Sequence, residues 1–270
     1  MIFTSWTIEL VSIALLGLCL GSFLNVLIIR LPRGRSIWSP GSRCGFCRSP
    51  IKAWRNIPLI SFLLNRGMCG SCGHPYSFRY FFIELLMGVL SVGVWSMYGW
   101  TALTAALILF VALLVAISFI DLDFRLIPDE LSLGGWAVAL LAIAFGFTSF
   151  PLYSSDLLSE AWGLGSLAQA IVSSLFGFGI FFILSRVYYL LRGEEGLGGG
   201  DVKLMGLVGA VLGLQGVLTT ILIGSLLGSF LGIFLVLKGG KTRHFPIPFG
   251  PFLALGALAA VFRLDALIWP

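Results

Sequence analysis

Two short acidic segments are conspicuous because most of the chain is apolar. The first, residues 121–130, contains Asp121, Asp123 and Asp129; the second, residues 196–203, contains Asp201. Two carboxyl groups held close together share one proton, so one can take a proton from water while the other gives a proton to a leaving group. We therefore predict an aspartyl protease site at the membrane surface, with Asp121 and Asp201 as its two acids.

Simpler roles exist for each of these acids. Asp121 and Asp201 can be solvated helix ends, Asp123 can pair with Arg125, and Asp129 can cap the helix that follows Pro128. A Ser/His/Asp arrangement does not compete. The chain has two histidines, His74 in the cysteine loop and His244 near the carboxyl end, and neither lies in an acidic segment.

Three glycines and a lysine flank the second acid, in the order Gly198-Gly199-Gly200-Asp201-Val-Lys203. Glycine lets the backbone leave helical geometry, which would allow a peptide to approach Asp201. A phosphate-binding loop would end in Gly-Lys-Ser/Thr, and a dinucleotide-binding loop would have glycine at the position of Asp201. Neither pattern is complete here.

Four cysteines form a separate candidate site. Cys44 and Cys47 make one C-x-x-C pair, and Cys69 and Cys72 make a second. Two such pairs at this spacing are typical of a tetrahedral zinc site with four thiolate ligands. Because all four positions would be filled by protein, we predict a structural zinc rather than a catalytic one.

These sites must be positioned by membrane helices. The 270 residues are 58% hydrophobic and 11% charged, whereas a soluble domain has about 25% charged residues. Repeated apolar runs are long enough to span a bilayer of roughly 30 Å. We predict an all-α membrane protein with about eight transmembrane helices, at residues 6–29, 80–98, 101–120, 131–150, 164–191, 204–237 divided near Gly213, and 249–262.

The basic residues predict the orientation. Residues 30–79 hold nine of the seventeen Lys and Arg residues, which marks a cytoplasmic loop. The net charge of +5 is thus explained by topology, and we expect no nucleic-acid partner. With eight crossings, residues 151–163 are external, residues 238–244 are cytoplasmic, and every basic residue except Arg263 is cytoplasmic. Parity then places Asp121 and Asp201 at the same membrane face.

The acidic segments resemble those of the type IV prepilin peptidases, which are intramembrane aspartyl proteases of the G-x-G-D class. The resemblance rests on Asp121-Leu-Asp-Phe-Arg-Leu-Ile-Pro-Asp129 and Gly198-Gly-Gly-Asp201. It implies that Asp121 and Asp201 are catalytic and that Asp123 and Asp129 support the site. The amino-terminal half is similar to that of the bifunctional members of the family, through residues 21–25, 30–32, 56–61 and 79–84.

The resemblance also implies a function for each half of the chain. Residues 1–99 would form a module linked to N-methylation with S-adenosylmethionine as donor, and residues 100–270 the peptidase domain. Glu84 would either pair with a basic residue such as Arg79 or face the methyl-donor pocket. The implied substrates are prepilins or pseudopilins, cut after a glycine that follows a short basic leader, at the cytoplasmic face of a bacterial inner membrane.

Three other hypotheses fit part of the sequence. An ion-coupled transporter also uses membrane carboxylates and broken helices, but the chain shows no internal repeat. A catalytically silent, zinc-stabilised assembly factor would keep the fold and lose the activity. A related intramembrane protease with another substrate would not need the cysteine loop.

Overall fold

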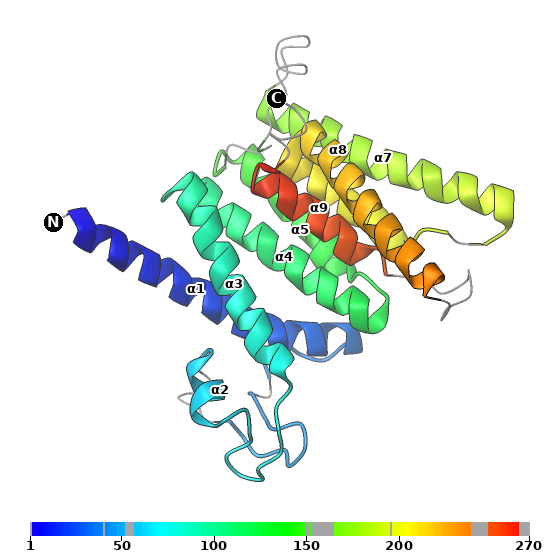
Figure 1. The fold of residues 1–270 in the computed structure, drawn as a ribbon. Coiled ribbons are helices and arrows are strands. Elements are labelled where there is room, and N and C mark those ends of the chain that lie inside the picture. Colours follow the sequence, from blue (N-terminus) through cyan, green and yellow to red (C-terminus); the bar gives the residue numbers. More distant parts are fainter. Residues whose placement is uncertain are drawn as a thin grey trace. The chain divides into compact units, whose positions relative to one another are not determined.

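A computed structural model describes residues 2–39, 41–51, 57–148, 152, 165–194, 196–238 and 248–264. In these ranges the regular secondary structure is helical, and the β-type pairing consists of two isolated bridges, Arg43 with Pro50 and Met68 with Pro75. The chain divides into two compact units, Met1–Thr104 and Ala105–Pro270 (Figure 1). The predicted all-α class is confirmed.

The first unit is built on two long helices. Helices α1 (Ile2–Arg30) and α3 (Phe78–Tyr98) pack together, and the segment between them contains a 3-10 helix η1 (Leu31–Arg33), the short α2 (Ile60–Leu64) and the cysteines. The two long helices approach closely because Gly21 has no side chain: a Cβ there would lie 2.6 Å from the Cα of Glu84. Small residues at such crossings are typical of membrane helices.

The second unit surrounds the first half of one helix. It contains α4 (Ala102–Phe124), α5 (Asp129–Ala144), α7 (Ser166–Arg192), α8 (Gly199–Leu237) and α9 (Gly250–Val261). The unit begins at Ala105, so the first three residues of α4 belong to the first unit. Helices α7 and α9 both pack on α8. Most of the buried residues of α8 are in its amino-terminal half, including Leu204, Met205, Leu207 and Leu212.

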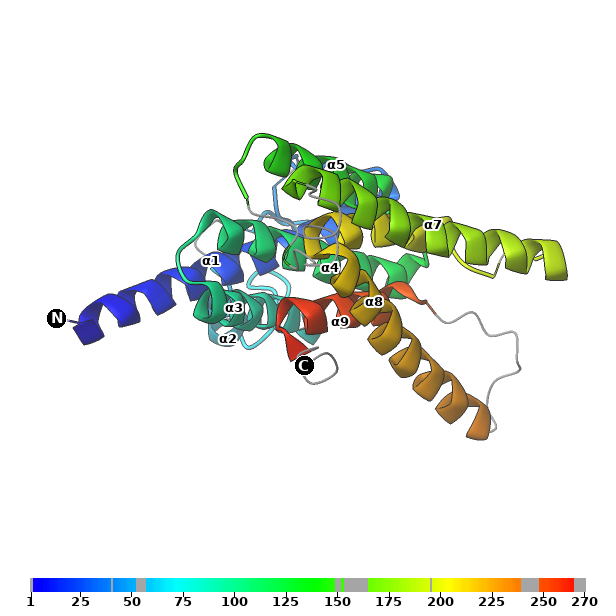
Figure 2. The ribbon, with the colours of Figure 1, turned by 90° about the horizontal axis from the view of Figure 1, so that it is seen from above.

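Helix α8 changes direction at one glycine. Gly213 has φ 78° and ψ −174°, a conformation that essentially only glycine adopts. Figures 1 and 2 show the orange carboxyl-terminal half of α8 diverging from α7 after this point. The helix therefore breaks at the predicted position, although Gly199–Leu237 counts as one candidate membrane span rather than two.

The count of eight spans is not established. In the described ranges, five helices are long and apolar enough to cross a membrane, namely α1, α3, α4, α7 and α8. Helix α9 has 12 residues, and α5 has 16 residues and ends at Ala144 rather than near residue 150. The predicted external segment, apart from Leu152, and the predicted cytoplasmic loop after Lys238 lie outside the described residues.

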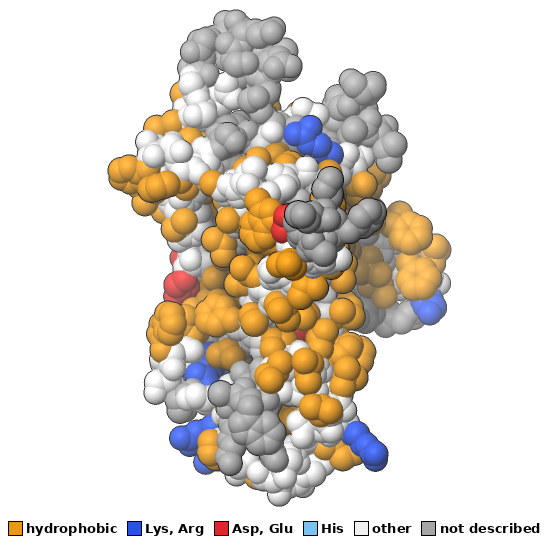
Figure 3. All heavy atoms as spheres, turned by 90° about the vertical axis from the view of Figure 1, so that its left-hand side faces the viewer, with side chains coloured by type: hydrophobic (Ala, Val, Ile, Leu, Met, Phe, Trp, Pro, Cys, Tyr) orange, Lys and Arg blue, Asp and Glu red, His pale blue; other side chains and the backbone are white. Residues whose placement is uncertain are grey.

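The exterior of the first unit is apolar. Side chains on α1 and α3, such as Ile8, Leu15 and Val89, are more than half exposed. The face drawn in Figure 3 is mostly hydrophobic, with few charged side chains among the apolar ones. Exposed apolar surface on long helices is expected where lipid is the solvent, and the chain is a membrane protein.

Close helix packing in the second unit gives a first prediction. A Cβ on Gly177 of α7 would meet the backbone carbonyl of Met205 on α8, whereas a Cβ on Gly179, two residues later, would meet nothing within 4 Å. Gly177→Ala should therefore lower stability by about 1–3 kcal/mol through overpacking. The check is the thermal unfolding midpoint of the detergent-purified protein.

Gly179→Ala is the matched control. It adds the same methyl group to the same helix in open space, so its midpoint should equal or slightly exceed that of the wild type, because alanine favours a helix more than glycine. Equal destabilisation by the two variants would show that α7 does not approach α8 at Gly177.

Candidate functional site

Asp121 lies in the last turn of α4. The helix ends after Phe124, where Arg125 takes a left-handed conformation with φ 54°. The turn is closed by the N–H of Arg125, which donates to the carbonyl of Asp121 at 2.9 Å. The Asp121 side chain is only 6% exposed, so it is not the solvated helix end that was the simpler alternative.

Asp201 lies in the first turn of α8 and is 7% exposed. Gly198 is the N-cap in an extended conformation, and Gly199 and Gly200 are already helical. The prediction that these glycines take the backbone out of helical geometry is therefore wrong for two of the three. Gly200 is required by contact instead, because a Cβ there would lie 2.6 Å from the Cβ of Ile127.

Both carboxyl groups are buried at helix ends in the second unit. Their hydrogen bonds differ. Asp121 Oδ2 accepts a backbone N–H at 2.9 Å, whereas Asp201 Oδ1 is buried with no hydrogen-bond partner in the described part of the chain. A buried carboxylate oxygen without a partner costs free energy, and such a group is suited to hold a proton or to bind a reacting molecule.

The supporting acids are more exposed. Asp129 is the first residue of α5, and Pro128 occupies the N-cap position. The prediction that Asp129 caps this helix is thus wrong, because Pro128 already has the extended conformation of the cap. Its carboxylate instead pairs with Nζ of Lys203 at 2.6 Å, which links the start of α5 to the first turn of α8. Asp123 is exposed on α4.

Sequence reasoning missed one contact at this site. The N–H that Asp121 accepts belongs to Gly250, the first residue of α9. The Gly-Pro pair at residues 250–251 does indicate a helix start, where N–H groups lack helical partners. Nothing in the sequence identified Asp121 as the acceptor, because 129 residues separate the two.

The cysteine pairs lie on two turns of the same construction. In each turn the N–H of the first cysteine donates to the carbonyl five residues later, Cys44 to Ser49 and Cys69 to His74. In each, the residue four after that cysteine has a left-handed backbone, Arg48 with φ 58° and Gly73 with φ 71°. The isolated bridges Arg43–Pro50 and Met68–Pro75 close the two turns.

The four thiols converge at one point. All four sulfur atoms lie within 4.8 Å of one another, with Cys44–Cys72 and Cys47–Cys69 each at 3.9 Å. With Zn–S bonds of about 2.3 Å, tetrahedral ligands are about 3.8 Å apart. The cluster thus fits a zinc ion.

The pKa shifts of the loop thiols are not uniform, since burial and the neighbouring cysteines raise the pKa of Cys72. Backbone N–H groups of Ser71 and Cys72 lower the pKa of Cys69 to about 5, which favours the thiolate that binds metal. His74, two residues after Cys72, stacks on the ring of Phe46 with centroids 4.6 Å apart. The set of four cysteines is complete without it.

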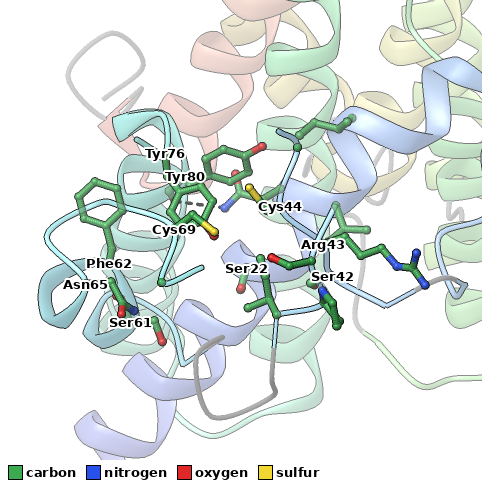
Figure 4. A pocket seen from close by; sticks show the side chains of 18 of the residues that line it. Ser22, Ser42, Arg43, Cys44, Ser61, Phe62, Asn65, Cys69, Tyr76 and Tyr80 are labelled. Atoms are coloured by element: carbon green, nitrogen blue, oxygen red, sulfur yellow. Dashed lines mark hydrogen bonds between the residues drawn. The ribbon is translucent and has the colours of Figure 1, made fainter. Parts of the chain in front are cut away.

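A cavity of about 900 Å³ lies in the first unit beside the cysteines. Figure 4 shows that α1 contributes Ser22, α2 contributes Ser61, Phe62 and Asn65, and the cysteine loop contributes Arg43. Aromatic and basic side chains also line it, namely Tyr76, Tyr80, Phe81, Arg30 and Arg48. The lining can hold a ligand with an aromatic group and charged groups.

Glu84 is one of the residues that line this cavity. It is 9% exposed on α3, and its Oε2 accepts the N–H of Leu59 at 2.9 Å. Leu59 precedes α2 and has φ 57°, an unfavourable conformation for leucine that this bond helps to hold. Glu84 thus connects α3 to the residue that precedes α2.

Comparison with known proteins agrees with this arrangement. Residues 15–98 match the bacterial peptidase A24 N-terminal domain, and residues 108–233 match the type IV leader peptidase family. A prepilin leader peptidase/N-methyltransferase from Neisseria gonorrhoeae is 35% identical, over 95% of this chain and 91% of the relative. Proteins of the same name from Aeromonas hydrophila and Legionella pneumophila are 37% and 33% identical over at least 90% of either chain.

No solved structure matches the chain. The two family matches cover both acids and all four cysteines in a single chain, and the similarity to the curated relatives extends over nearly its whole length. This protein belongs to the type IV leader peptidase family.

Proposed function

We propose that the protein cleaves the leader peptide from prepilins or pseudopilins and then methylates the new amino terminus. The observation that carries this proposal is the burial of Asp121 and Asp201 at helix ends of the same compact unit. It is supported by relatives named prepilin leader peptidase/N-methyltransferase. These relatives do not favour a transporter or a silent assembly factor.

The peptidase chemistry is acid–base catalysis on water. One carboxylate takes a proton from water, the resulting hydroxyl oxygen attacks the scissile carbonyl carbon, and the other carboxyl group supplies the proton that the carbonyl oxygen needs. The proton taken from water then goes to the nitrogen that leaves. Burial of both acids keeps bulk water away, which strengthens these interactions.

The substrate and the membrane fit each other in this proposal. A basic leader would remain at the cytoplasmic face of an inner membrane, and the apolar segment that follows it would lie in the bilayer. The support is the excess of basic residues in 30–79 and the exposed apolar side chains on the long helices.

Methyl transfer is assigned to the first 99 residues and cleavage to residues 100–270. The cavity beside the cysteines would hold S-adenosylmethionine, which supplies the methyl group. Tyr76 and Tyr80 offer aromatic faces for its adenine or its sulfonium cation, Arg43 can pair with its carboxylate, and Glu84 places negative charge on the same lining. Zinc would hold the loop that forms one wall.

The second prediction concerns the acid pair. Asp121→Asn and Asp201→Asn should each slow cleavage of a prepilin peptide by about 100-fold to 10,000-fold, because each removes one of the two proton-transfer groups. Cleavage rates of purified protein, followed by mass spectrometry, provide the measurement.

Glu130→Gln is the control for these variants. It also removes a carboxylate from the second unit, but Glu130 is exposed on α5 and has no assigned role. Its rate should match the wild type. Native-like cleavage by either aspartate variant would remove that residue from the catalytic pair.

The third prediction concerns the metal. Purified protein should contain about one zinc ion per chain, and Cys69→Ser should lose most of it, because a structural site needs all four ligands. Elemental analysis measures this directly. A chelator should not abolish cleavage through loss of a catalytic group, since the acids need no metal-bound water.

Cys19→Ser is the matched substitution. Cys19 lies on α1 and is not part of the cluster, so this variant should keep its zinc. A metal-free wild type, with the four loop thiols freely alkylated, would contradict the assignment.

The fourth prediction separates the two activities. Glu84→Gln keeps an oxygen that can accept the N–H of Leu59 but removes the charge from the cavity. We expect methylation of a pre-cleaved substrate to fall about tenfold, corresponding to roughly 1.4 kcal/mol, and cleavage of the uncleaved substrate to change less.

The control is Glu9→Gln, since Glu9 is the other acidic residue of positions 1–104. It is not among the residues that line the cavity, so both rates should be native. Equal loss of both activities in Glu84→Gln, at normal protein levels, would count against the proposed division of labour.

A further inference from the structure

The start of α9 touches the acid pair directly. The N–H of Gly250 donates to Asp121 Oδ2 at 2.9 Å, and this hydrogen bond is buried. Pro251 follows immediately in the first turn and has no N–H of its own. The contact joins the first residue of α9 to the last turn of α4 within the second unit.

Position 250 accommodates only glycine without displacement of Asp121. A Cβ there would lie 2.7 Å from Asp121 Oδ2, 3.2 Å from its Cγ and 3.4 Å from its Cβ. The backbone of Gly250 is not in the left-handed region. The requirement is therefore close contact with the carboxylate, and any side chain at this position would push the carboxylate away.

The contact gives the Asp121 carboxyl group a hydrogen-bond donor. An N–H group at the amino terminus of a 12-residue helix carries partial positive charge and favours an anion. Asp201 lies in the first turn of a second helix, α8, so each carboxyl group of the pair is close to the amino terminus of a helix.

We propose that Gly250 is a positioning residue of the peptidase site, which holds the Asp121 carboxyl group in its reactive position through its N–H and through the absence of a side chain. This inference rests on the proposed cleavage reaction. One acid of the pair takes a proton from water as the water oxygen bonds to the scissile carbonyl carbon, and the other gives its proton to the carbonyl oxygen. The C–N bond then breaks, the proton taken from water passes to the leaving nitrogen, and the hydroxyl proton of the intermediate returns to the acid that gave one as the new carboxyl group forms.

The test compares two glycines of α9. Gly250→Ala should lower kcat for prepilin cleavage by about 100-fold, the effect expected when a reacting group is misplaced by about 1 Å, with KM within about twofold. Gly256→Ala places its methyl group 2.5 Å from the carbonyl oxygen of Thr220 on α8 and does not reach Asp121. It should lower the unfolding midpoint while kcat per folded molecule stays within about twofold.

A double-mutant cycle tests the contact without using activity. Gly250→Ala should lower the unfolding midpoint less in an Asp121→Ala background than in the wild type, because the carboxylate that the new methyl group meets is gone. A midpoint change equal in both backgrounds would overturn the contact.

The remaining outcomes are also decisive. Provided that the wild type cleaves, three results would overturn the positioning role. They are a native kcat in Gly250→Ala, a rise in its KM without a fall in kcat, and a fall in the kcat of Gly256→Ala as large as that of Gly250→Ala. If the wild type cleaves no prepilin peptide, the proposed function fails and the positioning role fails with it, whatever the coupling in the midpoints.

Discussion

The structure of the second unit depends on the burial of two carboxyl groups inside an apolar helical unit. A carboxylate in such surroundings is costly unless polar groups face it. Here the polar groups come from helix starts: Asp201 is in the first turn of α8, and the N–H on Asp121 belongs to the first residue of α9. Two helices therefore start at the site.

The same requirement accounts for the close packing of the unit. The amino-terminal half of α8 is buried and α7 packs on it at Gly209, whereas α9 packs on the carboxyl-terminal half, where Gly256 meets Thr220. Gly177, Gly209 and Gly256 allow backbones to approach without side chains between them. Without a strong hydrophobic driving force in lipid, such packing stabilises helix association. It also fixes the directions of α8 and α9, and hence the positions of Asp201 and Gly250. The break at Gly213 lets the rest of α8 diverge after this packed half.

The first unit differs from the second in that it contains a polar loop beside two membrane helices. Four thiols replace the apolar core that a loop of this size lacks, and the two cysteine turns repeat one hydrogen-bond pattern. Glu84 connects α3 to the start of α2 through the N–H of Leu59. The cavity thus has walls from a helix pair and from a loop that a metal would make rigid. Such a cavity suits a reaction in which the donor and the amine must be brought together.

What the sequence determined by itself was the chemistry and the class of fold. Apolar run lengths predict membrane helices, paired C-x-x-C spacing predicts four thiols around a metal, and the rarity of acids in an apolar chain singles out Asp121 and Asp201. Each of these signals is local, or depends on composition, so no tertiary contact is needed to see it.

The sequence did not determine helix boundaries in the short segments, as α5 shows by ending at Ala144. It also misassigned Asp129 as a cap and the glycines before Asp201 as non-helical. Only the tertiary structure decided what each acid contacts: Lys203 for Asp129, Leu59 for Glu84 and Gly250 for Asp121. The physical reason is that these partners lie far apart in the chain, and only the packing of whole helices brings them within hydrogen-bond distance.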